Sequence, residues 1–136
     1  MSIAVARYAA ERNWRNVEMA TILLVEDDDL FRFAAKAGLE TAGFRVLSSG
    51  NVKTAMTILA NAAPDLLLTD VRLGGNIDGV VLSSMARAQR PVLRVLFLTG
   101  FEESIRRASD YGTVLAKPVK LDVLVAAVRR ELGQSR

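Results

Sequence analysis

Residues 67–73 read Leu-Leu-Thr-Asp-Val-Arg-Leu, an apolar run that ends at the carboxylate of Asp70 and then leads into a glycine-rich loop at 74–76. A short apolar run bounded by turn residues is typical of a strand that is buried on both faces of a parallel sheet. Ligands of open α/β sheets bind outside the carboxyl ends of such strands. Asp70 is therefore the first candidate for a residue with a chemical role.

Short apolar runs and longer helical segments alternate on both sides of this stretch. We expect strands at 21–25, 44–48, 65–69, 92–99 and 113–116. We expect helices at 29–42, 52–61, 78–89, 102–110 and 120–132, the second of them capped by Asn51. Strand-helix pairs with short connections form right-handed crossovers. The sequence thus predicts an α/β domain with a doubly wound, five-stranded parallel sheet and helices on both faces.

The composition excludes several classes of function. The chain has no Cys and no His, which removes disulfides, thiolate catalysis and the commonest metal ligand and general base. A net charge of +3, dispersed along the chain, and 6% aromatic residues do not favour nucleic acid as a partner. No apolar run approaches the roughly 18 residues of a membrane span. We expect a cytoplasmic protein that binds neither nucleic acid nor membrane.

Residues 1–19 differ from the rest, because apolar side chains such as Ile3, Val5, Tyr8, Trp14 and Val17 are only loosely helical in spacing. One interpretation is a poorly ordered extension, or an upstream start before Met19. The other is a short amphipathic helix that covers a surface or a second chain, with Trp14 as its anchor. We treat 1–19 as an N-terminal extension and 20–136 as the folded domain.

Polar side chains follow four of the expected strands, where the chain reaches the carboxyl edge of the sheet. They are Glu26, Asp27 and Asp28 after the first strand, Asp70 after the third, Thr99 after the fourth and Lys117 after the fifth. Paired carboxylates such as Asp27 and Asp70 need a cation to stay ionised together. With oxygen ligands alone, Mg²⁺ fits best.

A Mg²⁺ ion on two carboxylates keeps positions open for phosphate oxygens, and Lys117 adds positive charge from the opposite side. Thr99 could donate its hydroxyl to a phosphoryl oxygen, while Asp70 could act as a nucleophile that forms an aspartyl phosphate. Each residue alone has an ordinary explanation, such as an acidic helix N-terminus or a surface lysine. Their joint occurrence at four strand ends favours the phosphoryl site.

From residue 21 to about residue 132, the sequence resembles the receiver domain of two-component response regulators. The matching stretches are 22–28 (Ile-Leu-Leu-Val-Glu-Asp-Asp), 67–73, 78–79 (Asp-Gly), 97–100 (Phe-Leu-Thr-Gly) and 116–118 (Ala-Lys-Pro). The resemblance implies a flavodoxin-like, receiver-type fold with strand order 2-1-3-4-5. It also implies a phosphorelay protein that signals through protein contacts, with no output domain in this chain.

The resemblance assigns a role to each candidate residue. Asp70 would accept the phosphoryl group from a phosphohistidine on a sensor histidine kinase or histidine phosphotransfer protein. Lys117 would pair with that group, and Thr99 would move toward it. The chain would not be an enzyme beyond this self-phosphotransfer and slow autodephosphorylation.

The metal ligands implied by the resemblance come from two strand ends. Asp27 and Asp70 would bind Mg²⁺ directly, Glu26 would act largely through water, and the backbone carbonyl of Arg72 would complete the protein ligands.

Two departures from the family pattern concern the readout. Val114 stands where the family usually has the aromatic part of the switch, and Tyr111 should not be assumed to replace it. The loop Gly74-Gly75-Asn76 is one residue longer than the common form, and its glycines permit positive φ. These departures support one alternative, a degenerate receiver-like interaction module that works without phosphate. A phosphohydrolase of another α/β family is disfavoured because Arg72 stands where its second Asp would be.

The first helix presents two apolar stripes. If Phe31, Ala35, Leu39 and Ala42 are buried, then Leu30, Phe33 and Ala37 form a second stripe that is at least partly exposed. Receivers dock to the kinase through this helix, so Leu30, Phe33 and Ala37 are candidate partner-binding residues. Alternatively, residues 1–19 fold over the stripe, or Phe33 packs beneath a loop. The resemblance further implies a homodimer through the fourth and fifth helices, although a solvated charged face also explains the arginines of the fourth helix. The alternative, from the composition of residues 1–19, is a homodimer through the N-terminal segment.

Overall fold

A computed structural model of the chain describes residues 20–133. Both interpretations of residues 1–19, including the role of Trp14, fall outside the described residues. Within the described part, no helix combines the length and the apolar character needed to cross a membrane.

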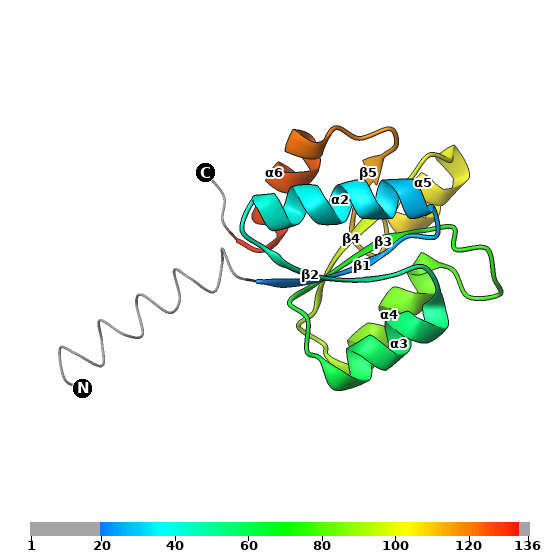
Figure 1. Cartoon of the computed structure of the whole chain (residues 1–136). Coiled ribbons are helices and arrows are strands. Elements are labelled where there is room, and N and C mark those ends of the chain that lie inside the picture. Colours follow the sequence, from blue (N-terminus) through cyan, green and yellow to red (C-terminus); the bar gives the residue numbers. More distant parts are fainter. Residues whose placement is uncertain (1–19, 134–136) are drawn as a thin grey trace, which may run out of the picture.

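Five strands alternate with five helices along the described chain (Figure 1). The strands are β1 (Thr21–Val25), β2 (Arg45–Ser49), β3 (Leu66–Asp70), β4 (Arg94–Thr99) and β5 (Thr113–Ala116). The helices are α2 (Asp29–Thr41), α3 (Val52–Asn61), α4 (Gly79–Gln89), α5 (Glu102–Ala108) and α6 (Leu121–Glu131). All strand pairs are parallel and the order is β2-β1-β3-β4-β5. The predicted doubly wound sheet and its strand order are confirmed.

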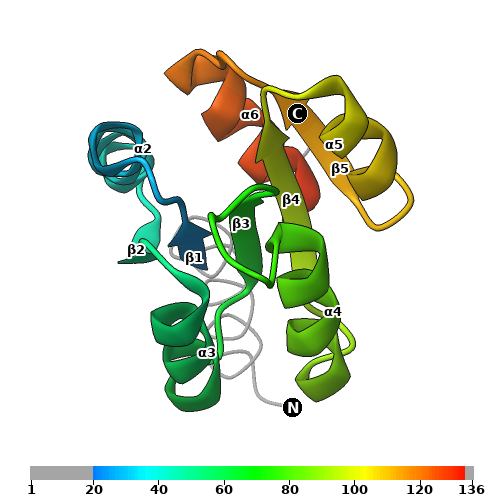
Figure 2. The ribbon, with the colours of Figure 1, turned by 90° about the vertical axis from the view of Figure 1, so that its right-hand side faces the viewer.

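The helices cover both faces of the sheet, with α2 and α6 on one side and α3 and α4 on the other (Figures 1 and 2). One core cluster lies under α2 and α6 and includes Leu24 and Leu68. The second lies under α3, α4 and α5 and includes Leu23 and Leu67. Neighbouring residues of β1 and β3 thus point into opposite cores, which explains why both strands read as continuous apolar runs.

The two stripes of α2 divide largely as predicted. Ala35 and Leu39 are fully buried, and the half-buried Phe31 and Ala42 pack against the same core cluster. Leu30 is 79% exposed and Phe33 72%, and Ala37 is exposed as well. Phe33 therefore does not pack beneath a loop of the described chain.

Several predicted boundaries were wrong by one or two residues. The fourth strand begins at Arg94 rather than at residue 92, because Val92 lies exposed in a turn closed by a bond from Leu93 N–H to the Arg90 carbonyl (3.0 Å). Asp78 is the N-cap of α4 and not its first residue, since its Oδ1 accepts from Val81 N–H at 2.9 Å. α5 ends at Ala108 and not at residue 110.

Other boundaries are close to their predicted positions. β2 is shifted by one residue, and β3 extends to Asp70 itself. α2 ends at Thr41 rather than residue 42, and α6 covers Leu121–Glu131 rather than 120–132. The predicted N-cap of α3 is confirmed, because Asn51 Oδ1 accepts from Thr54 N–H at 2.8 Å.

Candidate functional site

The carboxyl edge of the sheet carries a cavity of about 680 Å³. Five predicted site residues line it, namely Glu26, Asp27, Asp70, Arg72 and Lys117. They come from the ends of β1, β3 and β5, which the parallel topology brings together. The edge that the sequence singled out is therefore a hollow that could hold a small polar ligand.

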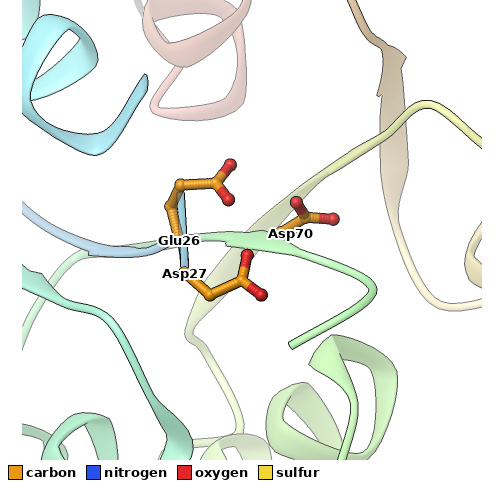
Figure 3. Close-up of side chains that lie close together, drawn as sticks. All are labelled: Glu26, Asp27 and Asp70. Carbon is orange, nitrogen blue, oxygen red and sulfur yellow. The ribbon is translucent and has the colours of Figure 1, made fainter. Parts of the chain in front are cut away.

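Three carboxylates meet in this cavity. Glu26 and Asp27 follow β1, Asp70 ends β3, and one oxygen from each lies within 4.8 Å of the others (Figure 3). Glu26 is fully buried and Asp70 is 8% exposed, whereas Asp27 faces solvent. Three hard oxygen donors at this spacing suit a divalent cation such as Mg²⁺ better than a softer metal.

Lys117, just after β5, joins two of these carboxylates. Its Nζ lies 2.7 Å from Asp70 Oδ2 and 2.5 Å from Glu26 Oε1, and 4.7 Å above the ring of Phe31. Burial lowers the pKa of Lys117, but its hydrogen bonds to Asp70 and Glu26 and their charges outweigh that effect and raise the pKa overall. The lysine is therefore a permanent cation of the site.

Glu26 is the most strongly perturbed acid of the site. Burial, with a smaller contribution from the charge of Asp70, raises the pKa of the Glu26 carboxyl to about 7, although bonds from Lys117 and from the Asp28 backbone N–H oppose the rise. Its pairing with Lys117 was not predicted. The position after an apolar strand indicates which edge Glu26 occupies, but not that its side chain turns inward to the lysine.

Asp70 is held by bonds to both of its carboxylate oxygens. Oδ1 accepts from the backbone N–H of Arg72 at 3.2 Å, and Oδ2 accepts from Lys117. Arg72 thus contacts Asp70 through its backbone amide. Its carbonyl stays a predicted metal ligand.

Gly79 closes the loop that follows Asp70, a role that was not predicted. Its N–H donates to the Val71 carbonyl at 2.7 Å, and a Cβ at this position would lie 2.1 Å from the Asp70 carbonyl oxygen. Only glycine allows the start of α4 to approach the end of β3 this closely. In the loop itself Gly74 has a φ of 72°, while Gly75 does not use positive φ.

Phe101 forms part of the cavity wall and was also missed. The guanidinium carbon of Arg72 lies 3.9 Å above the Phe101 ring, a cation–π contact between the loops after β3 and β4. An ion pair between Arg107 and Asp78 also joins α5 to the loop after β3. The one available signal in the sequence was a large apolar residue directly after the loop residue Gly100.

The two predicted switch residues lie on neighbouring strands. Thr99 is fully buried at the end of β4 and lies outside the lining of the cavity, and its Oγ1 accepts from the Phe101 N–H at 3.3 Å. Val114 is half-buried in β5, beside Phe97 of β4, and packs against the core under α3, α4 and α5. Tyr111 lies outside the cavity lining and is 47% exposed.

Known proteins are similar to this chain in sequence and in structure. The sequence model of the family described as the response regulator receiver domain matches residues 22–129. The chain is 38% identical over 119 residues to the response regulator receiver protein CpdR of Brucella abortus, covering 84% of this chain and 98% of CpdR.

A second curated relative is longer. The DNA-binding transcriptional regulator NtrC of Salmonella typhimurium is 28% identical over 121 residues, which cover 86% of this chain but only 26% of NtrC. The chain therefore spans about a quarter of the length of this relative. Among solved structures, the receiver domain of the hybrid histidine kinase CckA matches with a TM-score of 0.71 and 32% identity, covering 82% of this chain and 98% of that one.

Proposed function

Because this chain belongs to the response regulator receiver domain family, we propose that Asp70 accepts a phosphoryl group from a phosphohistidine in a Mg²⁺-dependent step. The donor would be a sensor histidine kinase or a histidine phosphotransfer protein. The observation that carries the proposal is the contact between Asp70 Oδ2 and Lys117 Nζ at 2.7 Å, beside two further carboxylates in an open cavity. A nucleophile, a fixed cation and a cluster of hard oxygen ligands are what phosphoryl transfer to a carboxylate needs.

The transfer uses an oxygen of Asp70 as the nucleophile. That oxygen bonds to phosphorus while the bond from phosphorus to the imidazole nitrogen breaks, and the nitrogen keeps the electron pair and takes up a proton. Lys117, released from Asp70 Oδ2, pairs with the charge of the phosphoryl oxygens. The aspartyl phosphate is then slowly hydrolysed, with no other substrate.

Asp27, Asp70 and the Arg72 carbonyl would hold Mg²⁺, with Glu26 acting largely through water. Bound there, the ion supplies positive charge to the phosphoryl oxygens. Glu26 has a second task in the absence of phosphate, because its Oε1 keeps the Lys117 ammonium beside Asp70.

The phosphorylated state would be read through Thr99. Its hydroxyl would leave the Phe101 N–H and donate to the phosphoryl group, which moves the loop after β4. Val114 has neither an aromatic ring nor a hydroxyl that could move together with Thr99. The conformational change on phosphorylation would therefore depend on Thr99 and on the part of the cavity wall formed by Phe101 and Arg72.

The exposed stripe of Leu30, Phe33 and Ala37 on α2 would bind the helical bundle of the kinase or phosphotransfer protein in the cytoplasm. The stripe borders the site, since α2 begins directly after the acidic residues that follow β1.

Homodimerisation through α5 and α6 belongs to the same proposal. An exposed Val123 on α6 favours such a contact, whereas Arg107 on α5 is already paired with Asp78.

The test is incubation of the chain with a small phosphodonor and Mg²⁺, followed by intact mass measurement. We expect the mass of one phosphoryl group, lost in Asp70→Asn and when EDTA removes the metal. Asp110→Asn, which changes an exposed acid in the turn after α5, is the matched control and should be phosphorylated normally.

Failure of Asp70-dependent phosphorylation would overturn the proposal. It would favour the alternative function, an interaction module that works without phosphate, for which Val114 at the switch position is the supporting observation.

A further inference from the structure

Residues of α2 and α6 line a groove of about 680 Å³. These two helices cover the face of the sheet opposite α3 and α4 (Figure 1). Its lining is mainly apolar and includes Ala34, Ala37, Gly38, Val125 and Ala126. None of the residues that line it belongs to the lining of the carboxylate cavity. The groove is therefore separate from the carboxylate cavity, and it shares Ala37 with the α2 stripe proposed above to bind the kinase or phosphotransfer protein.

Small residues make this groove deep enough for a bulky side chain. A Cβ at Gly38 would come within 2.9 Å of Leu121 Cδ2, so the two helices are as close there as a glycine permits. Around this contact Ala34 and Ala126 are exposed, and short side chains leave the space above them open. At one end Arg129 forms a wall, since it donates to the Ala42 carbonyl at 3.3 Å.

The chain enters the domain at that same end. Ala20, the first described residue, is 4% exposed and belongs to the core cluster that α2 and α6 cover. The Ala20 carbonyl accepts from the N–H of Arg45 at 3.0 Å. Arg45 follows Thr41 by only four residues, and Thr41 is both the last residue of α2 and part of the groove lining. Whatever precedes Ala20 therefore begins beside the end of the groove that Thr41 and Arg129 line.

The preceding segment, residues 1–19, has the length and composition to occupy it. It contains Ile3, Val5, Tyr8, Trp14 and Val17 and neither Gly nor Pro. Nineteen residues span about 28 Å even when helical, whereas the stretch from Ala34 to Thr41 measures about 10 Å along α2. A segment tethered this closely binds at an effective concentration in the millimolar range.

We propose that residues 1–19 bind back into the groove between α2 and α6, with the indole of Trp14 seated over Gly38 and Ala126. Trp14 and Ala20 are six positions apart in the sequence, a span of at most about 20 Å. An aromatic ring is the side chain that gains most from covering a shallow apolar surface of this kind. The occupant is this chain's own segment rather than a second copy, because the tether starts at the groove.

Trp14 is the only tryptophan of the chain, so its fluorescence reports on this segment alone. In the unchanged protein we expect blue-shifted emission and weak quenching by acrylamide. Ala126→Glu and Ala34→Glu place a charge in the groove and should shift the emission to that of a solvated indole, with a several-fold increase in quenching. Ala60→Glu, at an exposed position of α3, is the matched control and should change neither.

Three results would overturn the proposal. The first is a solvated indole in the unchanged protein, and the second is a buried indole that neither groove variant releases. The third is a blue shift that disappears on dilution, which would place the segment of a second copy in the groove. Circular dichroism checks that each variant is folded. Because no step requires phosphorylation, the outcome is independent of the function proposed for Asp70.

Discussion

Lys117 Nζ lies 2.7 Å from Asp70 Oδ2, and the same ammonium is shared with the fully buried Glu26. The lysine follows β5 and the aspartate ends β3, so the contact spans β4 and holds together the edge where the strands end. Removing either partner therefore affects both the charge balance of the site and its stability.

Replacement of Lys117 by Met leaves Glu26 buried beside Asp70 without a cation. We expect Lys117→Met to lower the free energy of unfolding by roughly 1–3 kcal/mol at pH 8 without Mg²⁺, less than for a fully buried pair because the lysine is partly exposed. Urea denaturation measures it. Lys120→Met, at an exposed neighbouring position, should change stability little. In the double variant Lys117→Met/Glu26→Gln, part of the lost free energy of unfolding should be restored. If it is not, the repulsion between Glu26 and Asp70 does not cause the loss.

The raised pKa of Glu26 makes stability depend on pH. The group titrates near 7 in the folded protein and near 4.5 when unfolded, so between these values the folded state binds more protons. The free energy of unfolding should therefore fall as pH rises through this window, by on the order of 1–3 kcal/mol. Lys117 adds no slope there, because its pKa is raised from 10.5 and it stays charged.

Denaturation curves at several pH values, recorded in EDTA, test this dependence. Glu26→Gln cannot ionise and should flatten the profile between pH 4.5 and 7. An equally steep profile in Glu26→Gln would assign the dependence to other groups.

The carboxylate cluster should make stability respond to Mg²⁺. An ion that binds only the folded state adds about 2.7 kcal/mol at 100 times its Kd. Thermal melting should show this gain in the unchanged protein and not in Asp27→Asn. Without metal, Asp27→Asn should be as stable as the unchanged protein or slightly more, since it removes like charge from the cluster. An undiminished response to Mg²⁺ in Asp27→Asn would exclude this carboxylate as a ligand.

Gly79→Ala should be strongly destabilising, because its Cβ would lie 2.1 Å from the Asp70 carbonyl oxygen and backbone has to move. We expect a loss of about 2–4 kcal/mol together with slower phosphorylation of Asp70. Gly75→Ala is the matched control in the same loop, where a Cβ would meet open space among the described residues and φ is not positive. Similar denaturation midpoints for the two variants would contradict the close approach.

The stacked pair of Arg72 and Phe101 should control how long the aspartyl phosphate survives. Phe101→Ala opens the cavity wall to water, so hydrolysis should accelerate several-fold after removal of the phosphodonor, measured by intact mass over time. Tyr111→Ala removes a similarly exposed aromatic outside the cavity lining and should leave the lifetime unchanged. An unaltered rate in Phe101→Ala would show that the ring does not shield the site.

The fold could be predicted because its determinants are local. The spacing of apolar residues and the turn residues between them identify each strand. The continuous apolar run of β3 follows from its two buried faces. The start of β4 was wrong because Val92 continues an apolar pattern into a turn, where burial no longer supports a strand.

The sequence could predict at which edge of the sheet the site lies, but not which side chains of the site contact each other. Strand ends bring Asp27, Asp70 and Lys117 together whatever their rotamers. The sharing of Lys117 with Glu26 depends on side-chain direction, and the stacking of Phe101 on Arg72 depends on two loops that meet only in three dimensions. Sequence patterns do not contain either kind of information.

The Lys117 ammonium, shared by Glu26 and Asp70, also determines how much positive charge a bound ion must bring to the carboxyl edge of the sheet. When Glu26, Asp27 and Asp70 are all ionised, Lys117 cancels one of three negative charges and leaves two, the amount that a single divalent ion neutralises. A monovalent ion would leave the pocket anionic and repel an incoming phosphoryl donor. If Asp70 receives a phosphoryl group as proposed, the doubly charged ion would decide whether the donor is repelled, and the concentration of free Mg²⁺ would be a second input to the signal.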